Sequence, residues 1–296
     1  MLRVVTNSDS IQIRAVKCVR SVDILCVMKT VLILLSAVLV QNPRIAQPVP
    51  VPAHKVIGNV YYVGPNDLGS YLITTPEGHI LINTDFEATV PLIRANVEKM
   101  GFKFTDIKII LASHSHSDHV EGDALVKQLT GAQVMVMEED VADTWRITPG
   151  NKAHPIDRVL NDGAEVKIGG TTLVAHLTPG HTKGCTTWTM QAQEEGKTYN
   201  VGILCGVGGV IGRQLVNNRD YPQIAEDYMR SFKILRSLPV DVFLASHSVF
   251  YNIGEKIGEV GKGRNPWIDP VGYKAHLDSQ EKVFLEELAK QTKRGQ

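Results

Sequence analysis

Four residues able to bind a metal ion lie within six positions of the chain. They follow a continuous apolar run at 107–112 and are His114, His116, Asp118 and His119. His114, His116 and Asp118 are spaced by two residues, which places their side chains on one side of an extended chain. Imidazole and carboxylate groups are ligands that suit zinc. The segment therefore predicts a metal site between a strand and a helix, in preference to a solvated polar loop.

Two further histidines stand in the same local context. His181 lies in Thr-Pro-Gly-His-Thr directly after an apolar run, and His247 lies in Ala-Ser-His-Ser after another. Either histidine alone would more often be an ordinary core or loop residue. Beside the first cluster, they complete six ligands, enough for two sites of three. Three protein ligands leave a coordination position open for water, which is typical of catalytic zinc rather than structural zinc.

The elements that must position these residues follow from the pattern of apolar residues. Strands are expected at 60–63, 71–74, 80–82, 107–112, 133–137, 165–168, 171–177, 186–190, 198–205 and 242–245. Helices are expected at 88–100, 119–129, after Asp220, and at 271–290. Antiparallel strands in both halves, with helices between them, favour a sheet packed on a sheet with helices outside. No linker separates the halves, so residues 55–296 are expected to form one domain.

The composition narrows the class of protein. The chain has 296 residues, 43% hydrophobic and 21% charged, close to globular averages. Its 31 Lys and Arg residues balance 31 Asp and Glu residues, whereas nucleic-acid binders and polybasic membrane binders usually carry a basic excess. Four cysteines are too few for a disulfide scaffold. These values favour a globular protein and argue against a nucleic-acid binder or a polybasic membrane binder.

The first part of the chain has the pattern of a targeting segment. Lys29 precedes an apolar run at 31–40, which is too short to span ~30 Å of hydrocarbon as a helix. We expect a signal peptide at 28–46, an upstream extension at 1–27 and a proline-rich linker at 47–54. The alternative is that the apolar run is a buried element of the fold. Export predicts a periplasmic or secreted protein with no stable membrane association after signal removal.

The metal-binding pattern carries a family resemblance. His-x-His-x-Asp-His followed by two histidines at strand ends resembles the metallo-β-lactamase superfamily. The stretches 109–119, 180–188 and 265–270 are similar to class B β-lactamases of subclass 3, and the similarity runs from about Lys55 to Lys290. The resemblance implies the α/β (α+β) metallo-β-lactamase fold. This fold is an αββα sandwich of two mixed β-sheets, with helices on the outer faces and a two-zinc site at the sheet edge.

The resemblance also implies a ligand set and a reaction. The first zinc would be held by His114, His116 and His181, and the second by Asp118, His119 and His247. Relatives that bind two irons carry Glu at the position of His116, so zinc is expected. A hydroxide held by the metals would attack the β-lactam amide of penicillins, cephalosporins and carbapenems, with Asp118 orienting it. The implied role is antibiotic resistance, by a protein expected to be a monomer.

Some positions depart from the pattern of the subclass. Serines that contact the substrate carboxylate usually stand where this chain has Gly206 and Gly208, so its means of holding the carboxylate is open. Lys183 occupies a loop position that is often proline, and is either a positive charge near the site or a solvated lysine. Cys185 and Cys205 either pair after export or remain free buried thiols. The family has bridges with this spacing.

Other functions remain as alternatives. A lactonase or a glyoxalase-type thioester hydrolase would use the same fold. Such relatives usually carry a metal-bridging Asp near Gly206, where only Gly-Val-Gly-Gly stands at 206–209. An RNA phosphodiesterase is disfavoured by the neutral charge and the expected export, and a non-catalytic zinc module by the open coordination positions. Trp188 and Trp267 are expected in the core. Five other histidines are expected to be structural or surface residues: His54, His79, His154, His176 and His276.

Overall fold

Two β-sheets organise the part of the chain that the computed structural model describes, residues 51–294. The seven-stranded sheet has the order β1-β2-β3-β4-β5-β6-β7. Its strands are β1 His54–Ile57, β2 Val60–Tyr62, β3 Tyr71–Ile73, β4 His79–Ile82, β5 Ile107–Leu111, β6 Gln133–Met137 and β7 Arg158–Leu160. The five-stranded sheet has the order β12-β11-β10-β9-β8. Its strands are β8 Glu165–Ile168, β9 Thr171–Leu177, β10 Thr186–Glu194, β11 Lys197–Leu204 and β12 Val242–Ala245.

Both sheets are mixed. In the first sheet, β1 to β4 pair antiparallel and β4 to β7 pair parallel. In the second sheet, β8 to β11 pair antiparallel and β12 joins β11 in parallel. The β8–β9 hairpin turns at Gly169 and Gly170, both at positive φ, as a two-residue hairpin turn requires. The expected antiparallel pairs in both halves are present.

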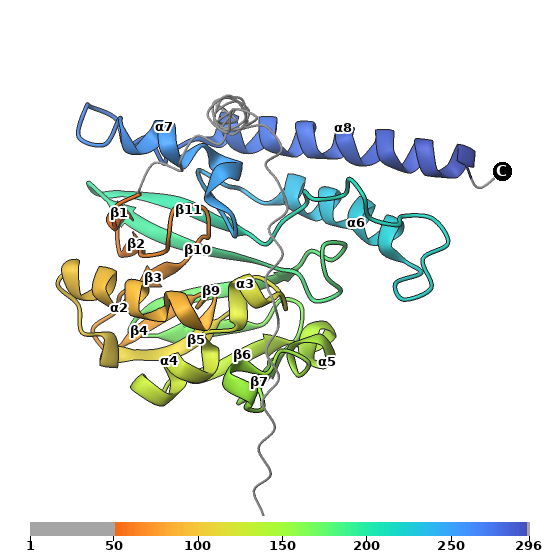
Figure 1. The fold of residues 1–296 in the computed structure, drawn as a ribbon. Helices are drawn as coiled ribbons and strands as arrows, with labels where there is room; N and C mark the ends of the chain where they lie inside the picture. Colours follow the sequence, from red (N-terminus) through yellow and green to blue (C-terminus); the bar gives the residue numbers. More distant parts are fainter. Residues whose placement is uncertain (1–50, 295–296) are drawn as a thin grey trace, which may run out of the picture. The chain divides into compact units, whose positions relative to one another are not determined.

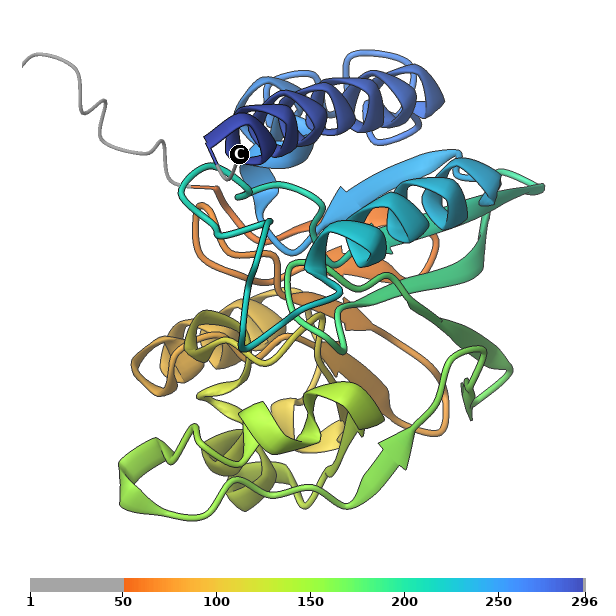
Figure 2. The same ribbon diagram turned by 90° about the vertical axis from the view of Figure 1, so that its right-hand side faces the viewer.

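Helices cover the outer faces of the two sheets (Figures 1 and 2). The α-helices are α2 Val90–Lys99, α3 Ser117–Val120, α4 Asp123–Thr130, α5 Val141–Thr144, α6 Ile224–Ser237, α7 Ile253–Ile257 and α8 Pro270–Arg294. Short 3-10 turns are η1 Glu87–Thr89, η2 Phe104–Asp106, η3 Glu138–Asp140, η4 Pro149–Asn151 and η5 Ser248–Tyr251. Helices α2 and α4 lie on the first sheet, and α6 and α8 on the second.

Alternating side chains of the parallel strands fill two cores. Along β5, Ile109 and Leu111 face the core between the sheets, whereas Ile110 faces the core beneath α2 and α4. A strand buried on both faces must be apolar throughout, which explains the continuous run at 107–112. Helix, sheet, sheet and helix thus form successive layers, and the expected αββα sandwich is confirmed.

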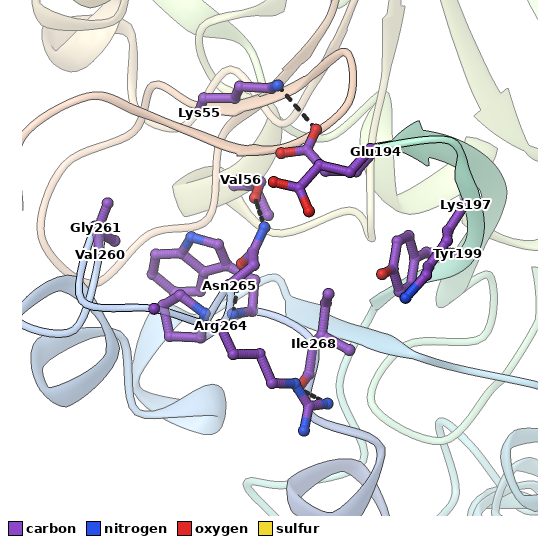
Figure 3. A pocket seen from close by; sticks show the side chains of 14 residues that line it. Lys55, Val56, Glu194, Lys197, Tyr199, Val260, Gly261, Arg264, Asn265 and Ile268 are labelled. Atoms are coloured by element: carbon purple, nitrogen blue, oxygen red, sulfur yellow. Dashed lines mark hydrogen bonds and ion pairs between the residues drawn. The ribbon is translucent and has the colours of Figure 1, made fainter.

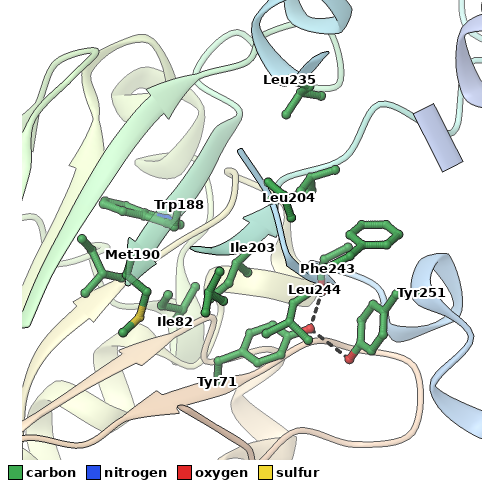
Figure 4. Packing of buried hydrophobic residues seen from close by; sticks show 14 of the residues in the cluster. Tyr71, Ile82, Trp188, Met190, Ile203, Leu204, Leu235, Phe243, Leu244 and Tyr251 are labelled. Carbon is green, nitrogen blue, oxygen red and sulfur yellow. Dashed lines mark hydrogen bonds between the residues drawn. The ribbon is translucent and has the colours of Figure 1, made fainter. Parts of the chain in front are cut away.

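The core between the sheets is rich in aromatic residues. The Tyr71 hydroxyl donates a hydrogen bond to the carbonyl of Ala245 at 2.7 Å and lies 3.0 Å from the Tyr251 hydroxyl. Figure 4 shows Tyr71 and Tyr251 side by side in this core. A buried hydroxyl is tolerated there because it has hydrogen-bond partners. Trp188 and Trp267 are both about 1% exposed, as expected of core residues.

Some local predictions differ from the structure. The single helix expected at 119–129 is wrong, because α3 and α4 are separate helices interrupted at Glu121 and Gly122. The chain passes Thr84 so closely at Gly122 that a Cβ atom there would lie 2.6 Å from the Thr84 carbonyl oxygen. This tertiary contact has no local signal. Strands β1 and β7 were not expected, and β1 begins at the last residue of the expected linker.

The expected upstream extension and signal peptide lie outside the described residues, as does the linker up to residue 50. Within residues 51–294, no helix has the length and apolar character needed to cross a membrane.

Candidate metal centre

The six predicted ligands come together as two adjacent groups of three. In each group, one nitrogen or oxygen atom per residue lies within 4.8 Å of the others. The first group is His114, His116 and His181, and the second is Asp118, His119 and His247. The ring centroids of His114 and His119, one from each group, are 4.2 Å apart. The arrangement therefore offers two neighbouring metal positions with three ligand atoms each.

Strand ends from both sheets supply the groups. His114 and His116 follow β5, Asp118 and His119 lie in α3, and the other two histidines follow β9 and β12. The loop after β5 is attached to β10 of the second sheet. The Thr186 amide donates to the carbonyl of Ser113 at 2.8 Å, and the Trp188 indole donates to the carbonyl of Ala112 at 2.9 Å. These contacts hold the ends of the two sheets at one edge.

A buried carboxylate, that of Asp140, joins two of the ligand loops. One oxygen accepts hydrogen bonds from the Ser115 amide at 2.9 Å and the Thr182 hydroxyl at 2.8 Å. The other oxygen accepts from the Gly184 amide at 2.6 Å. Burial raises the pKa of Asp140, while these hydrogen bonds act in the opposite direction. Sequence reasoning missed this residue, because an acid at the end of Glu-Glu-Asp has no pattern that distinguishes it from a solvated charge.

A second connector is Asn83, directly after β4. Its side-chain oxygen accepts from the Ser113 amide at 2.8 Å, and its amide nitrogen donates to the carbonyl of Gly69 at 2.8 Å. The Gly69 amide in turn donates to the carbonyl of Ser246, next to His247, at 2.7 Å. Asn83 has a φ of 62°, a backbone conformation that asparagine tolerates better than most residues. The loop after β5 is thus fixed relative to the loop after β12.

The state of the imidazoles fits metal binding. The Nε2 atom of His114 and both ring nitrogens of His119 are buried without a hydrogen-bond partner. Unsatisfied buried polar atoms are costly, and a coordinated metal ion would satisfy one nitrogen of each ring. Burial lowers the pKa of His114 and His119 well below the usual value and that of His181 to about 3. The rings are therefore neutral, the form that binds metals. Neutral imidazoles with one carboxylate are a donor set that zinc accepts.

A disulfide joins Cys185 to Cys205, with the Cα atoms 5.7 Å apart. This pairing is the one that the family resemblance implies. Cys185 ends the loop that carries His181, and Cys205 follows β11 just before the glycine-rich segment. The Cys205 sulfur lies 3.5 Å from Nδ1 of His114. The disulfide therefore packs directly against His114 of the first metal-binding group.

The residues expected to contact substrate behave differently from one another. The Lys183 ammonium lies 5.5 Å from the centroid of the Tyr221 ring, a cation–π contact on an exposed side chain. Gly209 borders the centre, because a Cβ atom there would lie 3.8 Å from Nδ1 of His181. Gly208 lies beneath α8, and a Cβ atom there would lie 2.9 Å from the side-chain oxygen of Gln280. At Gly206, a Cβ atom would meet only Ser246, at 3.8 Å.

One cation at the centre was not expected from the sequence. Arg213 follows the glycine-rich segment, and its guanidinium donates to the carbonyl oxygens of His181 at 2.8 Å and Gly209 at 3.0 Å. Its second terminal nitrogen lies 3.3 Å from Nδ1 of His181. The loop between β11 and α6 decides this position, and no local pattern around Arg213 reveals it.

The remaining histidines have partners elsewhere. His154 is buried, with Nε2 3.0 Å from a carboxylate oxygen of Asp123. His54 stacks between Tyr62 and Trp267. These contacts agree with the structural roles expected from the sequence.

A cavity of about 640 Å³ lies at the turn between β10 and β11. Figure 3 shows it bordered by the ion pair of Lys55 and Glu194 on one side and by Arg264 on another. None of its lining residues belongs to the two metal-binding groups, so the metal chemistry is not located there.

Comparison with known proteins agrees with the fold and the site. The family described as "Metallo-beta-lactamase superfamily" matches residues 69–193. The native FEZ-1 metallo-beta-lactamase from Legionella gormanii is 46% identical, with a TM-score of 0.79 over 83% of this chain and 98% of that chain. BJP-1 of Bradyrhizobium japonicum, a subclass B3 metallo-beta-lactamase, is 34% identical, with a TM-score of 0.75 over 84% and 98%.

A curated relative has a different activity in its name. A protein of Rhodopseudomonas palustris (strain BisB5) named hydroxyacylglutathione hydrolase is 30% identical over 171 residues, 58% of each chain. The chain thus spans about three fifths of the length of this relative. The fold, the ligand arrangement and the similarity over most of the chain show that the chain belongs to the metallo-β-lactamase superfamily. Its structural neighbours are subclass B3 metallo-β-lactamases, and it is a hydrolase of this superfamily.

Proposed function

We propose that this protein is a two-zinc β-lactamase that hydrolyses the amide bond of penicillins, cephalosporins and carbapenems. The observation that carries the proposal is the pair of adjacent three-ligand groups, His114, His116, His181 and Asp118, His119, His247. A tetrahedral zinc site has four coordination positions, and each group supplies three ligands. One position at each zinc would therefore stay open for water. Similarity to solved metallo-β-lactamases over most of the chain supports the substrate class.

The chain's own residues would prepare the reaction. Zinc, when bound, lowers the pKa of water toward ~7 and polarises a carbonyl oxygen. The first group would hold one ion and the second group the other. The Asp118 side chain is 29% exposed, so its carboxylate can accept a hydrogen bond from the attacking water and orient it. Asp140 and the Cys185–Cys205 bridge keep the loops in place, so no reorganisation is needed when substrate arrives.

A thioester hydrolase of the glyoxalase type is the second candidate. It is supported by the hydroxyacylglutathione hydrolase relatives. Against it stands the segment after β11, where Gly206 to Gly209 provide no carboxylate to bridge two metals. Within residues 51–294, the two groups contain a single carboxylate, that of Asp118, and it belongs to the second group. The β-lactamase proposal therefore has the stronger support.

The context of the enzyme is part of the proposal. Residues 55–296 would be the catalytic domain of a monomer, exported to the periplasm or the medium by a signal peptide at 28–46 that follows an extension at 1–27. Its partners would be small β-lactams, and it would confer antibiotic resistance.

A substrate panel tests the proposal most directly. The mature, zinc-loaded protein is assayed with three β-lactams, namely nitrocefin, a penicillin and a carbapenem. A lactone and the thioester S-lactoylglutathione are assayed in parallel as substrates of the alternative activities. We expect turnover of the β-lactams that a chelator abolishes and added zinc restores. Thioester or lactone turnover with no β-lactam turnover would reverse the assignment in favour of the second candidate.

A further inference from the structure

The guanidinium of Arg213 is held at the rim of the first metal-binding group. Two backbone carbonyl oxygens, those of His181 and Gly209, accept hydrogen bonds from it. The backbone of Arg213 is fixed as well, because its carbonyl accepts from the Gln291 amide on α8 at 2.7 Å. Hydrogen bonds to both the guanidinium and the backbone of Arg213 thus hold this loop residue next to His181.

The guanidinium still has hydrogens to donate. It carries five N–H groups, and its three contacts leave one N–H on each terminal nitrogen. When His181 binds a metal through Nε2, its Nδ1 carries a hydrogen and can no longer accept. The terminal nitrogen that faces Nδ1 is then released as well. With a metal on Nε2, Arg213 would therefore have a further N–H group free for an incoming acceptor.

The positive charge of Arg213 is not paired with a carboxylate. Its partners within the described residues are two carbonyl oxygens and a neutral imidazole, and the side chain is half-buried. A half-buried cation that lacks an anionic partner favours the arrival of one. A carboxylate is the anion whose geometry best matches the two remaining N–H groups.

The other positions expected to hold the substrate carboxylate are less suitable. Gly206 and Gly208 have no side chain to offer, and Lys183 lies over the Tyr221 ring. We infer that Arg213 binds the carboxylate beside the β-lactam ring and so takes the role of the absent serines. This inference rests on the proposed function, since it names the group that recognises its substrate.

The test compares a β-lactam acid with its methyl ester, which lacks the charge. Arg213→Gln should raise KM for the acid about 10- to 150-fold, the equivalent of the ~1.5–3 kcal/mol of a charged hydrogen bond at about 1.36 kcal/mol per tenfold. KM for the ester should stay within about twofold. Arg213→Lys should restore part of the affinity, because the charge remains and the bidentate geometry does not. Arg219→Gln is the matched control, an exposed arginine on the same loop with no hydrogen bond or ion pair to the described residues.

A binding measurement separates this inference from the proposed function. Calorimetry with hydrolysed penicillin, a stable product that keeps the ring carboxylate and gains a second one, should show the same 10- to 150-fold loss in Arg213→Gln, with unchanged zinc content. Equal losses for acid and ester, or a fall in zinc content, would show that Arg213 only positions His181 and would overturn the inference. A wild-type protein that turns over no β-lactam would refute the proposed function, and the calorimetry would still decide whether Arg213 binds carboxylate.

Discussion

Removing the Asp140 carboxylate should loosen the loops that carry His114, His116 and His181. The carboxylate accepts three hydrogen bonds of 2.6–2.9 Å from Ser115, Thr182 and Gly184, and it is 1% exposed. In Asp140→Ala, two buried backbone N–H groups lose their acceptor, at ~1–3 kcal/mol each. The hydroxyl of Thr182 can rotate to another partner.

The expected free-energy change follows from these contacts. We expect Asp140→Ala to lower the free energy of unfolding by about 2–6 kcal/mol. Part of the loss is offset, because burial of the carboxylate is itself unfavourable, as its raised pKa shows. Asp140→Asn keeps one oxygen and removes the charge, so its loss should be smaller. Displaced loops should also weaken metal binding, by the ~10–100-fold that removal of groups supporting metal ligands usually costs.

Two measurements test this reasoning. Urea unfolding of the metal-free protein gives the loss in stability, and competition with a chromophoric chelator gives the zinc affinity. Asp143→Asn is the control, since this acid lies three residues further on and pairs with Arg146 on the surface, where a small effect of ~0–1 kcal/mol is expected. Wild-type stability and zinc affinity in Asp140→Ala would show that the two loops hold their positions without the Asp140 carboxylate.

Three further predictions concern the metals, the disulfide and pH. His116→Ala should remove the first metal, because two protein ligands remain, so metal analysis should fall from two zinc ions per chain to one. Denatured, unreduced protein made by export should show no free thiol from Cys185 or Cys205, and replacing both by serine should cost ~3 kcal/mol; two titratable thiols would contradict the pairing. Burial lowers the pKa of His276 to about 4. In the unfolded chain His276 takes up a proton near pH 6.5, whereas in the folded protein it stays neutral down to about pH 4. The free energy of unfolding is therefore highest above pH 6.5 and falls by up to ~3 kcal/mol as the pH drops toward 4. His276→Asn should flatten this part of the stability–pH curve, and an unchanged slope would refute the assignment.

Local sequence patterns were sufficient to predict most strands and the six candidate metal ligands that the fold brings together. Strands β6, β8, β9 and β12 have the bounds expected from their apolar runs and flanking turns. Alternation and turn residues act between neighbours in the chain, so they can be recognised without a fold. The cluster from His114 to His119 was recognisable for the same reason, since its spacing alone places several ligands on one side.

Tertiary structure decided what depends on approaches between distant segments. The break at Gly122 comes from the close passage of Thr84, and nothing in the helical pattern shows it. Asp140 connects two loops that follow strands of different sheets, because both loops donate hydrogen bonds to its carboxylate.

The residue proposed to bind the substrate carboxylate also depends on tertiary structure and not on local sequence. Lys183 was the candidate cation because it occupies a loop position that is often proline in the family, yet its ammonium lies over the Tyr221 ring. Arg213 stands 32 positions from His181 and reaches its carbonyl at 2.8 Å. The ligand types and their spacing were therefore set by the sequence itself. Which charges meet at the metal centre was decided by the folded loops, because only folding brings residues far apart in the chain within hydrogen-bond distance.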